Sequence, residues 1–182
     1  MRINILREKY CKKCPIVKRS KRSTGVKFLL EITNVENLRV LDYGCSNWRN
    51  TTYLESLGAT SLKIDATPHT KPDIVAYPTH MPIRDKAVDI TLFTHIFMFL
   101  EDKAHWPTAA QELQRITKRY IVVETYTVKN SAALKYQPEE IIKLFYNIKK
   151  KYVRKDLQVF IISQMGQKQD RGEASRDDFT TA

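Results

Sequence analysis

Residues 40–48 read Val-Leu-Asp-Tyr-Gly-Cys-Ser-Asn-Trp, a short apolar run that ends in an acid and then turns at a glycine. The apolar start is typical of a buried strand that ends at Asp42. Gly44 permits a tight turn and lets the backbone approach a ligand closely. A second strand-like run, residues 62–65, ends in Asp65. Ligands of doubly wound sheets bind at such carboxyl ends, and an acid in the second position can accept both hydroxyls of a ribose.

Outward from this stretch, short apolar runs alternate with helical patterns from residue 38 to residue 165. The predicted strands are 38–42, 62–65, 73–76, 88–93 and 120–124, followed by a short strand from Tyr152 that turns at residues 154–156 into a long one, 157–165. The predicted helices are 51–57 and a segment after Asp102 that ends at Ile116. The runs are rich in Val, Ile and Leu without strict alternation, as expected for parallel strands covered on both faces. Helices that separate short buried strands predict an α/β fold with a doubly wound, mostly parallel sheet.

Two further helices are predicted from their ends. Ser23 or Thr24 suits the N-cap of a helix that covers the sheet. Pro138 suits the first position of a later helix, and Lys149, Lys150 and Lys151 suit its negative end. An apolar stripe lies between these ends, at Ile141, Leu144, Phe145 and Ile148. The pattern therefore predicts one helix from Pro138 to the lysines.

Composition restricts the class of protein. The chain has 182 residues, of which 42% are hydrophobic and 28% charged, and this profile excludes collagen, low-complexity disorder and a disulfide scaffold. No apolar run approaches the ~20 residues that a membrane span needs, and no secretory signal is visible. We therefore expect a cytoplasmic protein with no membrane association.

Positive charge gathers in two segments. Residues 1–27 carry ten Lys or Arg against one Glu, and residues 143–165 carry six against one Asp, in a chain of net charge +11. Such clusters suit nucleic-acid phosphates or another acidic surface, although a solvated face carries similar charge. The resulting division is a basic arm (1–22), a domain (23–165) and a polar tail (166–182) that we expect to be disordered.

Four stretches occur in an order and spacing that resemble the class I S-adenosylmethionine-dependent methyltransferases. They are VLDYGCSNW, LKIDATP, MPIRDKAVDITLFTHIFMFLED and AAQELQRITKRYIVVETY, within residues 28–165. The resemblance implies a methyltransferase with S-adenosylmethionine as cofactor. It also implies a Rossmann-like, seven-stranded sheet whose last strand, here LQVFIISQM, is antiparallel and lies beside the fifth.

The resemblance also assigns roles to particular residues. The loop that cradles the methionine part of the cofactor matches Asp42, Gly44, Cys45 and Ser46; the ribose and adenine positions match Asp65, Ala66 and Tyr77; and the residues that line cofactor and acceptor match Thr94 and His95. His95 is the candidate acid/base group. Ser46 and Trp48 stand where the family often has two further glycines, and Trp48 could narrow or cover the pocket. No metal site is expected.

Several alternatives stay open. Because Ser46 and Trp48 replace two glycines that the family often has, the chain could be a methyltransferase-like binding module without activity. A dinucleotide-binding oxidoreductase is disfavoured, because Gly44 is the only glycine of the three that its fingerprint needs. Cys11 and Cys14 have the spacing of half a zinc site, but free thiols or a redox pair fit the same spacing.

The acceptor is not named by any motif. The basic arm, with Tyr10, Tyr77 and Trp106 as stacking candidates, favours RNA or DNA as acceptor. A small molecule or a protein is the alternative. The sequence indicates no particular oligomeric state.

Overall fold

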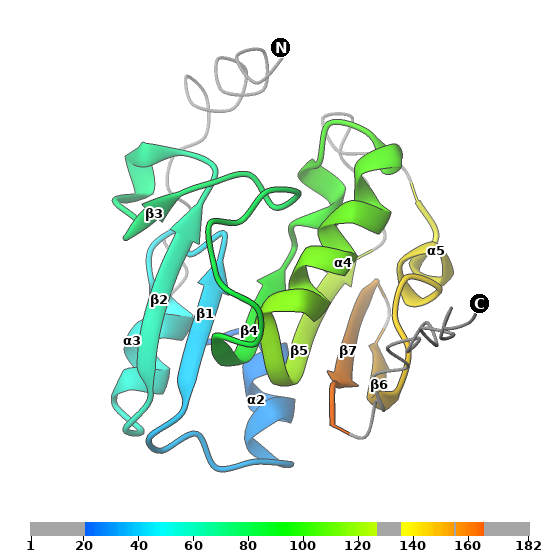
Figure 1. Ribbon diagram of the computed structural model, residues 1–182. Helices are drawn as coiled ribbons and strands as arrows, with labels where there is room; N and C mark the ends of the chain where they lie inside the picture. The colour runs from blue at the N-terminus through cyan, green and yellow to red at the C-terminus, as the bar shows by residue number, and fades with distance from the viewer. Residues whose placement is uncertain (1–20, 127–135, 155, 166–182) are drawn as a thin grey trace, which may run out of the picture.

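A computed structural model describes residues 21–126, 136–154 and 156–165, which form a seven-stranded sheet with helices on both faces (Figure 1). The strands are β1 (Arg39–Tyr43), β2 (Thr60–Asp65), β3 (Ile74–Val75), β4 (Val88–Thr94), β5 (Thr117–Tyr126), β6 (Ile148–Arg154) and β7 (Leu157–Ser163). Their order is β3-β2-β1-β4-β5-β7-β6, and β7 runs antiparallel to both β5 and β6. The predicted sheet, with its antiparallel last strand beside the fifth, is confirmed.

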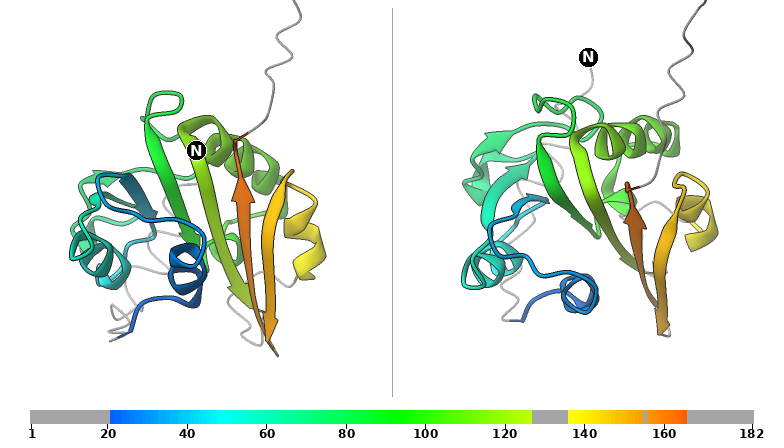
Figure 2. Two further views of the ribbon diagram at one scale, coloured as in Figure 1. Left: turned by 90° about the horizontal axis from the view of Figure 1, so that it is seen from below. Right: turned by 60° about the horizontal axis from the view of Figure 1, so that its bottom comes forward.

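Helices cover both faces of this sheet. Helices α2 (Thr24–Leu30) and α3 (Arg49–Glu55) lie on one face, and α4 (Trp106–Ile116) and α5 (Pro138–Ile142) lie on the other, as Figure 2 shows from two directions. The side chains of one strand alternate between the two cores: Val40 packs with α2 and α3, and Leu41 packs with α4. Because both faces are covered, the parallel strands are apolar along most of their length.

The cover helix α2 begins where the sequence predicted. Ser23 is its N-cap, and its Oγ accepts a hydrogen bond from the Val26 amide at 3.3 Å. Val26 and Leu29 are fully buried and pack against Val122 of β5 and Ile161 of β7. The apolar side of this helix is therefore the reason that it docks on the sheet.

The helix predicted from Pro138 to Lys151 is wrong at its C-terminal end. Its start is as predicted, with Pro138 in the first turn and a capping box between Gln137 and Glu140, but α5 ends at Ile142. Asn147 then adopts a left-handed conformation (φ 57°), and residues 148–154 pair with β7 as the edge strand β6. The three lysines lie on a sheet edge, where cationic side chains discourage pairing with another chain.

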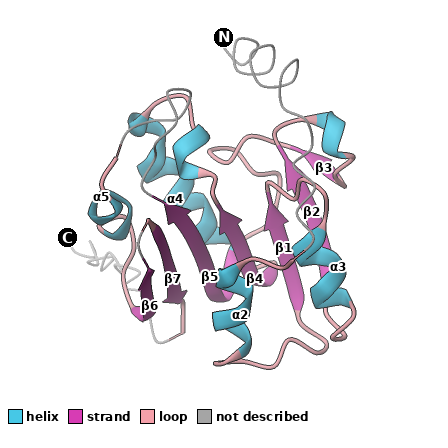
Figure 3. Cartoon of the chain, turned by 180° about the vertical axis from the view of Figure 1, so that it is seen from behind, coloured by secondary structure: helices cyan, strands magenta, loops and turns pink. Residues whose placement is uncertain are grey.

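The carboxyl ends of β1, β2, β4 and β5 meet at one edge of the sheet, the upper edge in Figure 3. We call it the carboxyl edge. The chain moves outward from β1 through β2 to β3, and then returns to place β4 on the other side of β1. Such a reversal opens the sheet between β1 and β4 to a ligand at their carboxyl ends.

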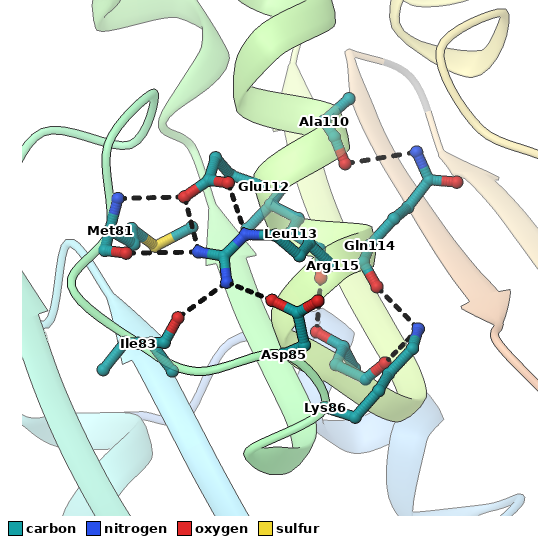
Figure 4. Close-up of polar contacts among 10 residues, drawn as sticks. Met81, Ile83, Asp85, Lys86, Ala110, Glu112, Leu113, Gln114 and Arg115 are labelled. Atoms are coloured by element: carbon teal, nitrogen blue, oxygen red, sulfur yellow. Dashed lines mark hydrogen bonds and ion pairs between the residues drawn. The ribbon is translucent and has the colours of Figure 1, made fainter.

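Arg115, near the end of α4, lies at the side of the sheet where the parallel strands begin, opposite the carboxyl edge (Figure 4). Its guanidinium contacts the carboxylates of Glu112 at 2.6 Å and Asp85 at 2.7 Å, and donates to the carbonyl oxygens of Met81 and Ile83. We call this group the Arg115 clamp. It fastens the loop before β4 to α4. Glu112 and Arg115, which belong to the stretch AAQELQRITKRYIVVETY, therefore have a structural role.

Some predictions concern residues outside the described ranges. The basic arm up to residue 20, with Cys11 and Cys14, and the tail 166–182 lie there. Within the described ranges, no helix has the length and apolar character to cross a membrane. In the same ranges, no group of three His, Cys, Asp or Glu side chains is arranged to hold a metal ion.

Candidate functional site

Asp42 is a buried carboxylate at the end of β1, with 2% of its surface exposed. Thr51, in the first turn of α3, donates a hydrogen bond to its Oδ2 at 3.0 Å. Its Oδ1 has no hydrogen-bond partner among the described residues. Burial raises the pKa of Asp42 to about 7, against the smaller opposing effects of Thr51 and Arg49. The site therefore contains an acceptor atom that the fold itself does not use.

The loop after Asp42 has an unusual backbone. Gly44, Ser46 and Trp48 adopt positive φ values of 74°, 47° and 61°. A Cβ at Gly44 would lie 2.2 Å from Cδ1 of Ile96, so the Ile96 side chain can pack here only because residue 44 is glycine. Non-glycine residues with positive φ are costly and often mark functional loops.

Cys45 lies in the same loop and is buried. Its Sγ is 4.0 Å from Oγ1 of Thr70. Burial, with the nearby charges of Asp65 and Asp42, raises the pKa of this thiol to about 12. Cys45 is therefore a neutral thiol at physiological pH, and it suits a lining role better than a nucleophilic one.

Asp65 at the end of β2 lies beside the same loop. Its Oδ1 accepts from the Thr67 amide at 3.1 Å, and the amides of Ser46 and Ala66 also donate to its carboxylate. Burial nevertheless raises the pKa of Asp65 above its ordinary value. The bond from Ser46 shows that the structure brings the first loop and the second acid together, as the sequence predicted.

Trp48 reaches across this side of the site. Its Nε1 donates to the carbonyl oxygen of Thr70 at 2.9 Å, and the ammonium of Lys63 lies 5.5 Å from the centre of its ring. The indole, 37% exposed, joins α3 to the turn that follows β2. Trp48 therefore fixes the position of the Asp42–Trp48 loop relative to the turn after β2, next to Asp65.

Thr94 and His95 end β4, and both are buried. His95 has a φ of 62°, and its amide donates to the backbone oxygen of Glu124 at 2.6 Å. Its Nε2 lies 3.0 Å from Oε1 of Glu124, and its ring stacks on Tyr126 with centres 4.0 Å apart. The predicted acid/base residue is thus one half of a buried pair.

Tyr77 takes a different direction from the other predicted cofactor residues. Its hydroxyl accepts from the Glu101 amide at 3.3 Å, and the edge of its ring meets His105. Tyr77 therefore joins the segment after β3 to the segment after β4. Its contact with an adenine ring stays a prediction.

The start of the described chain is fastened to the carboxyl edge. Arg49 donates from Nη1 to the carbonyl oxygen of Lys21 at 2.7 Å, and the Ser23 amide donates to Oδ1 of Asn50 at 2.8 Å. The guanidinium of Arg22 lies 4.5 Å from the centre of the Tyr53 ring. The basic arm therefore enters the fold directly beside the site.

Sequence reasoning missed several residues of this site. Thr51 holds Asp42, Arg49 and Asn50 hold the entering chain, and Glu124 holds His95. For Glu124 a signal existed, because it ends the predicted fifth strand, residues 120–124, as Asp42 ends the predicted first. Thr51 lies in the predicted helix 51–57, whose periodicity does not indicate which polar side chains face a site, and Arg49 and Asn50 lie just before that helix.

Comparisons with known proteins agree with this arrangement. A sequence model described as "Methyltransferase domain" matches residues 41–120, from β1 into β5. No curated protein matches the chain in sequence.

Solved structures share the fold at low sequence identity. The PH0226 protein of Pyrococcus horikoshii OT3 is 12% identical, with a TM-score of 0.69 over 85% of this chain and 98% of its own. The magnesium protoporphyrin IX methyltransferase of Synechocystis PCC 6803, solved with bound S-adenosylmethionine, is 12% identical, with a TM-score of 0.68 over 88% and 96%. A SAM-dependent methyltransferase of Aquifex aeolicus is 16% identical, with a TM-score of 0.58 over 77% and 89%.

The sequence match begins in β1 and ends in the first half of β5, and the solved structures share the fold over most of this chain. Residues 41–120 therefore match the methyltransferase-domain family, and the chain has the fold of S-adenosylmethionine-dependent methyltransferases.

Proposed function

We propose that this protein is an S-adenosylmethionine-dependent methyltransferase whose acceptor is RNA or DNA. The observation that carries the enzyme assignment is the meeting of the Asp42–Trp48 loop with Asp65 at the point where the strand order reverses. The acceptor assignment depends on the basic arm and on the place where it enters the fold.

The residues at the carboxyl edge fit this cofactor. The unpartnered Oδ1 of Asp42 can accept from an ammonium group, and the carboxylate of Asp65 can accept from ribose hydroxyls. Gly44 has no side chain, and Ile96 lies in the space that a Cβ would take, so the loop backbone stays close to the end of β4. When bound, the cofactor supplies an electrophilic methyl group on a sulfonium.

The protein's part in such a transfer is to align the acceptor and to take up a proton where one is released. His95 is the group that takes up this proton, because it directly follows β4 beside the Asp42–Trp48 loop and its ring is held in a buried pair with Glu124. The backbone of residues 21–25 closes the same edge by hydrogen bonds to Arg49, Asn50 and Glu124.

The charge of the arm supports a nucleic-acid acceptor. Ten Lys or Arg within residues 1–27 lead into a segment that is fastened beside Asp42 and His95. Each phosphate that a cation neutralises releases counterions, so affinity for nucleic acid falls as salt rises. Cations in this part of the sequence can hold a phosphate backbone while a base or ribose reaches the site.

Calorimetry with S-adenosylmethionine and S-adenosylhomocysteine tests the enzyme assignment. We expect binding by the full chain, weakened at least tenfold in Asp65→Ala because two hydrogen bonds to a charged acceptor are lost. Asp89→Ala is the matched control: Asp89 accepts from the Arg39 amide at the opposite edge of the sheet, and its loss should leave affinity unchanged. If folded wild-type protein binds neither compound, the chain is a binding module without this activity.

Nucleic-acid binding measured across salt concentration tests the acceptor. One full-length variant replaces Lys18, Arg19, Lys21 and Arg22 by Gln, and its control replaces four exposed cations outside both basic segments, Arg39, Lys71, Arg84 and Lys118. We expect the arm variant to lose affinity and to show a salt dependence weaker by about one unit of slope for each lost contact. Equal binding by both variants, or methyl transfer to a small acceptor by the arm variant at the wild-type rate, would overturn the nucleic-acid assignment.

A further inference from the structure

Glu124 is a buried carboxylate to which the proposed function assigns no role. It lies in β5, two residues before the end of the strand, with 4% of its surface exposed, and its two oxygens have different partners. Oε1 lies 3.0 Å from Nε2 of His95, and Oε2 accepts from the Gly25 amide at 2.5 Å. From these contacts the geometry points to Glu124 as the positioning residue of His95, which fixes its ring and its tautomer for proton uptake. This inference rests on the proposed function.

The imidazole of His95 is held from three directions. The backbone amide of His95 donates to the Glu124 carbonyl, the ring nitrogen meets the Glu124 carboxylate, and the ring face stacks on Tyr126 at an interplanar angle of 24°. The positive φ of His95 turns the backbone so that all three contacts form at once. One ring orientation satisfies them all.

Glu124 is itself fixed by the cover helix. A Cβ at Gly25 would lie 2.7 Å from Cγ1 of Val122 and 3.1 Å from Oε2 of Glu124, so α2 comes this close to β5 only with glycine at this position. The Gly25 amide then holds the second carboxylate oxygen. Helix α2 is therefore a support for the pair as well as a cover for the sheet.

The charges around the pair favour an ionised Glu124. Burial acts to raise its pKa, but the hydrogen bond and charge of His95, the Gly25 amide and the charge of Arg49 outweigh burial, so the pKa of Glu124 is lowered. Tyr126 from β5 and Arg49 from α3 are the other titratable groups that act on the pair, and α2 contributes its backbone. An ionised carboxylate in this position favours the ring form that carries its proton on Nε2.

This arrangement has a direct chemical consequence. With the proton on Nε2, which faces Oε1 of Glu124 at 3.0 Å, the neutral imidazole has its lone pair on Nδ1. When an O–H or N–H acceptor is methylated, a lone pair of the acceptor atom would form the bond to the methyl carbon, and the methyl–sulfur bond would break with its electrons left on a neutral thioether. The proton of the acceptor would move to the ring, and the electrons of its O–H or N–H bond would stay on the acceptor atom. The resulting imidazolium is neutralised by Glu124. The pair therefore suits acceptors that must lose a proton, such as a hydroxyl or a protonated amine.

An NMR titration of the His95 ring in the full chain tests the pair without any ligand. Glu124→Gln keeps an acceptor for the Gly25 amide but removes the negative charge, and we expect the pKa of His95 to fall by about one unit or more. Glu112→Gln, which removes a carboxylate from the Arg115 clamp, is the control and should leave His95 unchanged. A His95 pKa that stays the same in Glu124→Gln would overturn the inference.

Two further measurements complete the test. The rising limb of the pH profile of kcat should move to lower pH in Glu124→Gln by the same amount as the NMR pKa, while cofactor affinity changes less than twofold. Absence of cofactor binding by the wild type would count against the proposed function, whereas the NMR result bears on the pair alone. If Glu124→Gln does not fold, the carboxyl titration of Glu124 in His95→Asn replaces it, and its pKa should rise above the wild-type value.

Discussion

Arg115 and Asp42 lie at opposite edges of the same sheet, each surrounded by loop backbone. Arg115 forms ion pairs with two carboxylates and hydrogen bonds with two carbonyl oxygens, and its side chain is 31% exposed. Asp42 is almost completely buried, has one hydrogen bond from Thr51 and leaves an oxygen without a partner. The clamp has its charges paired within the fold, whereas Asp42 has an oxygen that no described residue contacts by a hydrogen bond.

This difference separates residues that hold the fold from residues prepared for a ligand. Buried polar atoms in folded proteins nearly always have partners, so an exception calls for an explanation. At the clamp, removal of one residue leaves several groups unsatisfied. At Asp42, the folded protein already carries the cost of an unpaired carboxylate, and a bound cation would relieve it.

The largest effect on stability is expected at the clamp. Arg115→Met leaves Glu112 and the carbonyl oxygens of Met81 and Ile83 without their donor, and should lower the free energy of unfolding by about 3 kcal/mol. Urea denaturation measures this change. Lys103→Met is the control, because the Lys103–Glu140 pair is exposed and its loss should lower the free energy of unfolding far less than the loss of Arg115 does. Equal effects of the two substitutions would contradict the distinction drawn for the clamp.

Asp42→Asn should have the opposite sign at alkaline pH. The pKa of Asp42 is about 7 in the folded protein against an ordinary value of 3.8, so between these pH values the folded state holds a proton that the unfolded chain has lost. The free energy of unfolding therefore falls as pH rises through this window. The variant should lack this dependence and be more stable than the wild type by about 2 kcal/mol at pH 8.

Denaturation curves at pH 4, 6 and 8 measure this difference, and calorimetry supplies the second half of the test. If Oδ1 accepts from the cofactor's ammonium, Asp42→Asn should bind the cofactor more weakly while it folds more stably. A variant that loses stability at pH 8, or binds the cofactor as the wild type does, would show that Asp42 is a structural residue.

Thr51→Val should have a smaller effect. It removes the hydrogen bond to Oδ2 of Asp42 and should cost about 1 kcal/mol. Because this bond favours the ionised carboxylate, the loss should be greater at pH 8 than at pH 5. Thermal denaturation at the two pH values measures it, with Thr52→Val, an exposed neighbour on the same helix, as the control. The same loss at both pH values would exclude the link to Asp42.

The smallest change is expected for Trp48→Gly. The substitution removes the bond from Nε1 to Thr70 but also relieves the left-handed backbone, so the two effects nearly cancel and the net change should be below about 1 kcal/mol. Denaturation measures the stability. In wild-type protein, Trp48 fluorescence should change when cofactor fills the loop. An unchanged spectrum at saturating cofactor would place the indole away from the bound molecule.

Much of the fold and part of the site could be predicted from the sequence. The apolar runs predicted the parallel strands, and the acids after two of them predicted that Asp42 and Asp65 would meet. The helix from Pro138 shows where such reasoning fails: its apolar stripe continues to Ile148, but the pairing of β6 with β7 outweighs helical periodicity there. Long-range strand pairing leaves no local signal, so the start of β6 was assigned to the helix and only its last residues, from Tyr152, were predicted as strand.

The sequence by itself determined the identity of the acids, the glycine that turns the first loop, and the basic arm that precedes the domain. It determined them because strand ends, turns and charge runs are local properties of a chain. Only the tertiary structure decided which polar groups remain unsatisfied and which are paired. Thr51 reaches Asp42 across 9 positions, Glu124 meets Gly25 across 99, and each depends on how a helix packs against the sheet. The His95–Glu124 pair exists because β4 and β5 lie side by side, and that neighbourhood is a property of the folded sheet.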